Sequence, residues 1–172
     1  MGNYQTIMKK IKRALISVSD KRFLKDLLKV LTKYKIELIS SGGTYNEIRK
    51  LKFKCLEVSE YTGFSEVLGG RVKTLHPKIH AGILSKRNKR SHIKDLEKNN
   101  FSQIDLVIVN FYPFEKTLEQ TNNHLKIIEN IDVGGPTMVR AAAKNYNDVT
   151  VITSSEQYGE LINEIEKNKG ST

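Results

Sequence analysis

Short apolar runs alternate along the chain with stretches in which an apolar residue recurs every three or four positions. Short runs bounded by polar turns are typical of buried strands, and the spaced pattern is typical of helices that pack by one face. Five segments match the strand pattern: 13–18, 36–39, 53–58, 105–109 and 148–153. Because strands and helices alternate, the pattern predicts a three-layer α/β/α domain with a mostly parallel sheet of about five strands.

Helices are expected between these strands. The clearest has four leucines on one face between Leu24 and Leu31, and Ser19 or Asp20 is expected to cap its start. The others are expected at 45–51, in the second half of 86–100, at 124–131, at 136–145, and from a cap at Ser154 or Ser155 to Ile165. Pro136 suits the first position of its helix, where no backbone N–H is needed.

Length and composition fit a single folded domain. A chain of 172 residues can bury a sizeable core, and 38% hydrophobic with 28% charged residues is typical of globular proteins. No apolar run is long enough to span a membrane. Cys55 is the one cysteine, so an internal disulfide is excluded and a reducing, cytoplasmic compartment is expected. We expect a disordered leader at 1–11, the domain at 12–168 and the start of a linker at 169–172.

The net charge of +10 indicates a negatively charged partner. Nucleic acid is disfavoured because the lysines are spread along the chain, without zinc-ligand spacing, a basic helix with heptads or an RNA-binding aromatic motif. A phosphorylated small molecule explains the same charge more simply.

Two polar turns follow the first two strands. Ser17–Lys21 joins the first strand to a helix, and Ser40–Thr44, which contains Gly42 and Gly43, does the same after the second. The carboxyl ends of parallel strands open onto one edge of the sheet, where α/β folds bind ligands. Helix N-termini there attract anions through their free N–H groups. The two turns therefore predict a phosphate pocket at this edge.

The stretch 69–84 has neither helical nor strand periodicity and is rich in glycine and cationic side chains. Arg71, Lys73 and Thr74 are hydrogen-bond donors suited to an anion. A long polar loop in a compact chain is more often functional than idle. We therefore expect this loop to form a third wall of the phosphate pocket.

His76 and His80 lie four residues apart, a spacing that suits two metal ligands on one helix. Pro77 lies between them and argues against a regular helix, and no third ligand is evident. We expect these histidines to hold the loop through hydrogen bonds, and we expect no metal site.

Two further segments have the composition of a ligand site. The segment 110–114 (NFYPF) follows the fourth strand, and its two phenylalanines are expected in the core with Tyr112 at the sheet edge. The turn 132–136 leads into an alanine-rich helix with Arg140 and Lys144 on one face. Such a basic face on a closely packing helix suggests a role beyond solubility.

Five motifs, which cover almost the whole chain in this order, together resemble one family. They are Ser17–Lys21 (SVSDK), Ser41–Thr44 (SGGT), Gly69–Leu84 (GGRVKTLHPKIHAGIL), Asn110–Phe114 (NFYPF) and Ile131–Asn145 (IDVGGPTMVRAAAKN). The family is the IMP cyclohydrolase domain of bifunctional purine-biosynthesis proteins. The resemblance implies a methylglyoxal-synthase-like fold and a homodimer that closes formamidoimidazole carboxamide ribotide (FAICAR) to inosine monophosphate (IMP) and water, without metal or cofactor. Family members continue into a transformylase domain, so transformylase activity is not expected of this chain.

The resemblance also implies the residues of the site. Those expected to hold the nucleotide are Ser19, Asp20, Lys21, Ser41, Gly42, Gly43, Thr44, Arg71, Val72, Lys73 and Thr74, and those expected beside the base are Val109, Asn110, Asp132 and Val133. Those expected to take part in catalysis are Lys73, Tyr112, Asp132 and Lys144.

The reaction suggests a division of these roles, which we state as hypotheses. Asp132 or Lys144 would move the proton of the attacking nitrogen. Lys73 or Lys144 would stabilise the oxygen and assist water loss, and Tyr112 would position the carboxamide. Lys144 lies eight positions beyond Pro136, about 12 Å along a helix. It can therefore meet Asp132 only if the ligand lies along the helix or a second subunit supplies one of the two.

Three other interpretations remain open. A phosphate-sensing allosteric module of the same fold would keep the polar turns without needing Tyr112, Asp132 and Lys144 together. A basic nucleic-acid binder would show a steep salt dependence. Methylglyoxal synthase is the rival enzyme, although the SGGT turn and the RVKTLHP loop fit it poorly.

Overall fold

The structure is a computed structural model, and it describes residues 8–111 and 114–172, with the side chain of Lys116 excepted. The strands are β1 (Arg13–Val18), β2 (Glu37–Ser40), β3 (Leu56–Glu57), β4 (Leu106–Asn110) and β5 (Thr150–Ile152). The helices are α1 (Leu24–Lys33), α2 (Gly42–Lys50), α3 (Val58–Thr62), α4 (Pro77–Leu84), α5 (Arg90–Lys98), α6 (Phe114–Gln120), α7 (His124–Glu129), α8 (Gly134–Lys144) and α9 (Tyr158–Lys167). Two 3-10 turns, η1 (Leu68–Gly70) and η2 (Ser155–Gln157), complete the described elements.

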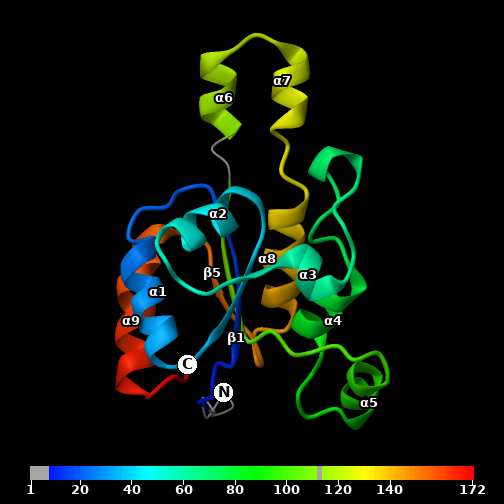
Figure 1. Cartoon of the computed structure of the whole chain (residues 1–172), viewed down its shortest axis with the longest axis vertical. Helices are drawn as coiled ribbons and strands as arrows, with labels where there is room; N and C mark the ends of the chain where they lie inside the picture. The colour runs from blue at the N-terminus through cyan, green and yellow to red at the C-terminus, as the bar shows by residue number, and fades with distance from the viewer. Residues whose placement is uncertain (1–7, 112–113) are drawn as a thin grey trace, which may run out of the picture.

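The five strands form one sheet in the order β3-β2-β1-β4-β5, and every neighbouring pair is parallel. The three-layer α/β/α prediction is confirmed, because helices cover both faces of the sheet (Figure 1). Since side chains alternate along a strand, Ile16 packs in one core with α1 and α9, while its neighbour Leu15 packs in the other with α3, α4 and α8. Because all neighbouring strands are parallel, their carboxyl ends lie at the same edge of the sheet.

Four of the five expected strands agree closely with the structure. The exception is the segment 53–58, of which only Leu56 and Glu57 pair with β2. The first helix begins at Leu24, and neither Ser19 nor Asp20 caps it. Instead Phe23 stands before the helix at φ 58°, without a side-chain cap. The expected cap at Ser154 is confirmed, but it opens η2, which leads into α9.

The expectation that Pro77 prevents a helix is wrong. Pro77 occupies the first turn of α4, where its missing N–H is not needed. The His76 side chain caps this helix, because its Nδ1 accepts a hydrogen bond from the Lys78 backbone N–H at 3.1 Å. The stretch 69–84 is therefore a loop followed by a helix.

A helical hairpin of α6 and α7 extends beyond the edge of the sheet that holds the carboxyl ends of the strands (Figure 1). The sequence pattern predicts α7 but not α6. Phe111, expected in the core, lies before this hairpin and is 45% exposed, whereas Phe114 is half-buried. Among the described residues, no helix is long and apolar enough to cross a membrane.

The two ends of the described chain pair with each other. Lys9 and Thr172 exchange backbone hydrogen bonds at 2.9 and 3.1 Å, and the Ile11 N–H bonds to the Gly170 carbonyl at 3.0 Å. Ile11 is 2% exposed. The last residues of the expected disordered leader, and those of the expected linker, therefore belong to the folded domain.

Candidate functional site

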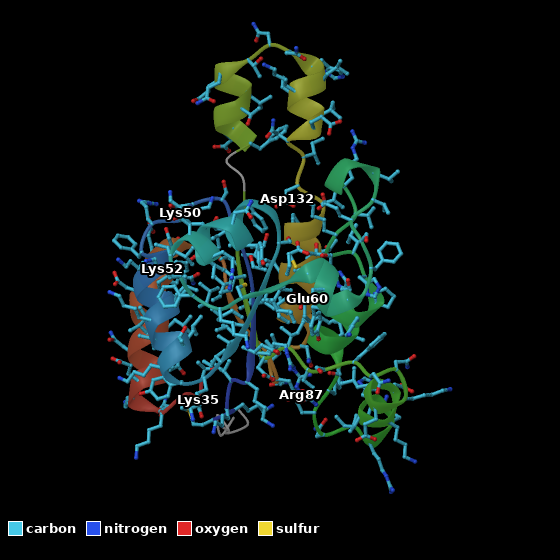
Figure 2. The ribbon with its side chains drawn as sticks, in the orientation of Figure 1. Lys35, Lys50, Lys52, Glu60, Arg87 and Asp132 are labelled. Atoms are coloured by element: carbon cyan, nitrogen blue, oxygen red, sulfur yellow. The ribbon has the colours of Figure 1, made fainter. Side chains whose placement is uncertain are left out.

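A cavity of about 810 Å³ opens at the carboxyl ends of β1, β2 and β4, below the α6–α7 hairpin. Its walls come from the loop after β1, the start of α2, the segment before α4, and the end of α7 with the start of α8. Figure 2 shows Asp132 at this end of the molecule. The three polar turns that the sequence predicts to converge do converge here.

Most of the predicted site residues line this cavity. They are Ser19, Lys21, Ser41, Gly42, Gly43, Thr44, Arg71, Lys73, Thr74, Asn110, Asp132 and Val133. The cavity also reaches residues that the sequence analysis did not single out, among them Glu129 and Met138. Glu129 lies outside the five motifs, and Met138 lies inside the last of them but has no polar side-chain group that would mark it as a site residue.

Four of the predicted residues do not line the cavity. Asp20 turns its carboxylate to the Ser155 hydroxyl at 2.7 Å and to Arg22, whose hydrogen bonds hold the Asp20 pKa well below its usual range. Val109 is buried in the core, and Val72 forms an isolated bridge with Val67. The fourth is Lys144, described below. Tyr112 lies outside the described residues.

Lys144 lies at the far end of α8 and lines a second cavity, of about 1040 Å³, together with Arg87. Figure 2 shows Arg87 at the opposite end of the molecule from Asp132. Within one chain, therefore, Lys144 and Asp132 do not face the same cavity.

The loop after β1 is held in place by the side chain of Asn110 at the end of β4. Its Oδ1 accepts hydrogen bonds from the backbone N–H groups of Ser19 at 2.7 Å and Asp20 at 2.9 Å. Its Nδ2 donates to the Asp20 carbonyl at 2.9 Å. Because one amide satisfies three backbone groups, Asn110 fixes the position of Ser19 and Lys21 on the cavity wall.

The start of α2 presents backbone N–H groups to the cavity. Ser41 precedes the helix and makes no side-chain cap, so the first N–H groups lack an intrahelical partner. Gly42 has φ +55°, a left-handed conformation that favours glycine, and Lys73 lies close by, since its Nζ would lie 3.6 Å from a Cβ at that position. The Thr44 hydroxyl is engaged elsewhere, because it exchanges hydrogen bonds with the backbone of Val18 at 2.9 and 3.0 Å. Free N–H groups and a nearby ammonium are what an anion needs.

Asp132 stands at the start of α8. Its Oδ1 accepts a hydrogen bond from the Gly135 N–H at 2.8 Å, and the Oδ2 would lie 2.3 Å from a Cβ at Gly135. Only glycine therefore allows the carboxylate this position. The contact orients the carboxylate and leaves it accessible, since Asp132 remains exposed.

His76 and His80 contact the protein's own backbone and core rather than the cavity. His76 caps α4, and burial lowers the pKa of His80, whose Nε2 has no hydrogen-bond partner among the described residues. In the described part of the chain, no three His, Cys, Asp or Glu side chains lie close enough together to hold a metal ion.

The chain that forms this parallel sheet and this cavity matches a known family, the MGS-like domain. A family model of that description matches residues 24–137, and the chain belongs to this family. The chain is 53% identical over 161 residues to the bifunctional purine biosynthesis protein PurH of Prochlorococcus marinus (strain NATL2A), covering 92% of this chain and 31% of that protein. It is 46% identical over 164 residues to PurH of Bradyrhizobium diazoefficiens, covering 95% and 31%.

The chain thus spans about a third of the length of these curated relatives, 31% in both cases. Among solved structures, the crystal structure of ForH superposes with a TM-score of 0.81 at 30% identity, covering 93% of this chain and 82% of ForH. The similarity therefore extends over nearly all of this chain.

Proposed function

We propose that this chain is an IMP cyclohydrolase domain that closes FAICAR to inosine monophosphate and water in the cytoplasm, without metal or cofactor. The observation that carries the proposal is a single cavity lined by Lys21, Lys73 and Asp132 beside the uncapped start of α2. The similarity to proteins named for bifunctional purine biosynthesis supports a purine ribotide as substrate. Transformylase activity is not part of the proposal.

The phosphate of the ribotide would bind at the start of α2. There the backbone N–H groups of Gly42 and Gly43 meet the ammonium of Lys73, and the loop held by Asn110 adds Ser19 and Lys21. Helix N-termini and cations stabilise a phosphate together. The base would then extend towards the start of α8.

The reaction needs proton transfers more than it needs a new nucleophile. The carboxamide nitrogen attacks the formyl carbon of the same molecule, so proximity is largely built into the substrate. A C–N bond forms and the formyl C–O bond breaks. The carboxamide nitrogen and the formamido nitrogen each give up one proton, and the formyl oxygen leaves with both as water. The carboxylate of Asp132 suits the proton transfer, and the ammonium of Lys73 suits stabilisation of the oxygen. Tyr112 would position the carboxamide.

Lys144 enters the proposal through a second copy of the chain. The eleven residues of α8 separate its ends by about 15 Å, so Lys144 of one chain opens onto the other cavity. We therefore include in the proposal a homodimer in which Lys144 of a second copy reaches the cavity of the first. The sharing would explain why a catalytic lysine stands at the far end of the helix.

The test is to incubate the purified chain with FAICAR and to follow IMP by absorbance. Lys73→Ala should lower kcat roughly a hundredfold, the usual cost of removing one group that stabilises a developing oxyanion. Lys50→Ala is the matched control, since Lys50 lies at the opposite end of α2 from the cavity. A wild-type chain that binds ribose 5-phosphate but forms no IMP would instead be a phosphate-sensing module of the same fold.

A further inference from the structure

Two of the three cationic side chains that line the cavity are already paired with carboxylates. Lys73 Nζ lies 2.9 Å from Glu66 Oε2, and Arg71 pairs with Glu129. The third, Lys21, has its Nζ 3.4 Å from the carbonyl oxygen of Ser19. Two of the groups best suited to a phosphate, Arg71 and Lys73, are therefore paired with carboxylates of the protein itself.

The Lys73–Glu66 pair is built into the backbone. Val67 and Val72 exchange backbone hydrogen bonds at 3.3 and 3.4 Å, which brings the residues on either side of them together. Gly70, at φ +91°, allows the lysine stem to pass, because its Cε would lie 2.7 Å from a Cβ there. This turn holds Glu66 beside Lys73.

The Arg71–Glu129 pair joins two walls of the cavity. Glu129 is the last residue of α7, and a carboxylate is unfavourable at a helix C-terminus unless a cation compensates it. Both side chains are largely exposed, at 64% and 58%. Exposed ion pairs are weak, so a ligand can displace this one.

We propose that Glu66 and Glu129 stand in for the substrate phosphate: each pairs with one cation of the cavity, gives way to the phosphate as it binds and returns as it leaves. This inference rests on the proposed function and adds two residues that set the affinity of the same site. A phosphate monoester carries about −1.5 to −2 charges at pH 7, which lets it displace a carboxylate of charge −1. The returning carboxylates then assist release of the product.

The experiment measures binding of ribose 5-phosphate by titration calorimetry, which requires no turnover. Glu66→Gln and Glu129→Gln should each tighten binding about two- to fivefold, the fold-change that corresponds to an exposed ion pair. Glu60→Gln is the matched control, because it removes the same charge from α3 (Figure 2). In the described part of the chain Glu60 forms no ion pair, and it does not line the cavity. That variant should bind like the wild type.

A double-mutant cycle distinguishes exchange at one cation from a general change of charge. In a Lys73→Met background, Glu66→Gln should no longer tighten binding, whereas Glu129→Gln still should. Equal tightening by Glu60→Gln, or an undiminished effect of Glu66→Gln in the Lys73→Met background, would overturn the inference. So would failure of all variants to bind ribose 5-phosphate. Failure of the proposed function has a different signature: ribose 5-phosphate binds as expected, but FAICAR is not converted.

Discussion

At the scale of single residues, the cavity depends on side chains that hold backbone rather than ligand. Asn110 and Thr44 lie on the cavity wall, yet their hydrogen bonds go to the loop after β1 and to β1 itself. The family resemblance assigns Asp20 to the nucleotide, but its carboxylate accepts hydrogen bonds from the side chains of Arg22 and Ser155 instead. Residues of this kind set the position of the groups that meet a ligand.

Replacing Asn110 with alanine should therefore affect stability and binding together. The variant leaves the N–H groups of Ser19 and Asp20 without their shared acceptor, which should cost about 1–3 kcal/mol in urea unfolding. Binding of IMP should weaken because the loop loses its position. Asn99→Ala is the control, since that exposed amide donates one hydrogen bond at the end of α5 and does not line the cavity. Normal IMP affinity in Asn110→Ala would contradict the positioning role.

The lowered pKa of Asp20 predicts a pH dependence. Hydrogen bonds from the Arg22 side chain, the Arg22 backbone and Ser155 favour the ionised carboxylate in the folded state. A carboxylate with a depressed pKa stabilises the fold fully above its unfolded pKa, about 3.9, and loses that contribution as the pH falls through the folded value. Asp20→Asn should thus lower Tm at pH 7, with a difference from wild type that shrinks below about pH 4. A constant difference down to pH 2 would contradict this cause.

At the scale of elements, the sequence pattern predicts an element well where its apolar side chains face the core. The four leucines of α1 are all buried, and β4 is an unbroken apolar run, so both segments agree with their expected ranges to within about two residues. The pattern fails where local chemistry decides. Pro77 starts a helix because His76 caps it, and α6 escapes prediction because its hairpin packs outside the two cores.

The residues of the candidate site can likewise be divided into those that the sequence pattern predicts and those that depend on the fold. Its polar turns are predictable because each follows an apolar strand, and parallel strands bring their ends to one edge. The proposed roles of Glu66 and Glu129 are not predictable from the sequence, since each depends on an ion pair with a cation that only the fold brings beside it. The course of α8 likewise separates Lys144 from Asp132, although both belong to one continuous motif.

Two helical glycines give a matched test of packing. A Cβ at Gly82 in α4 would lie 2.6 Å from the backbone oxygen of Ser102, whereas a Cβ at Gly159 in α9 would meet nothing within 4 Å. Gly82→Ala should therefore destabilise the domain by about 1–3 kcal/mol through overpacking. Gly159→Ala should stabilise it by about 0.5–1 kcal/mol, because alanine favours the helix. Thermal unfolding of both variants measures the contrast, and a stabilised Gly82→Ala would show that α4 packs differently.

At the scale of the whole molecule, the two cavities lie at opposite ends of one sheet, and α8 connects them. The cavity at the carboxyl edge holds Asp132 and Lys73 but lacks Lys144, which opens onto the other cavity. A homodimer that brings the second cavity of one copy against the first cavity of another would complete both sites at once. Such an arrangement predicts that two inactive variants, each with a different substitution, regain activity when they form a mixed dimer.

The proposed sharing makes a quantitative prediction. Asp132→Asn and Lys144→Ala homodimers should each be nearly inactive with FAICAR, because every site lacks one group. Mixed at equal amounts and allowed to exchange subunits, half of the dimers become heterodimers. In each of these, one site carries both defects and the other carries none. Activity should therefore rise to about a quarter of the wild-type value per chain.

The control mixes Asp132→Asn with Lys73→Ala, whose residues line the same cavity of one chain, so every site stays damaged and no activity returns. No recovery in either mixture would mean that Lys144 serves the cavity of its own chain.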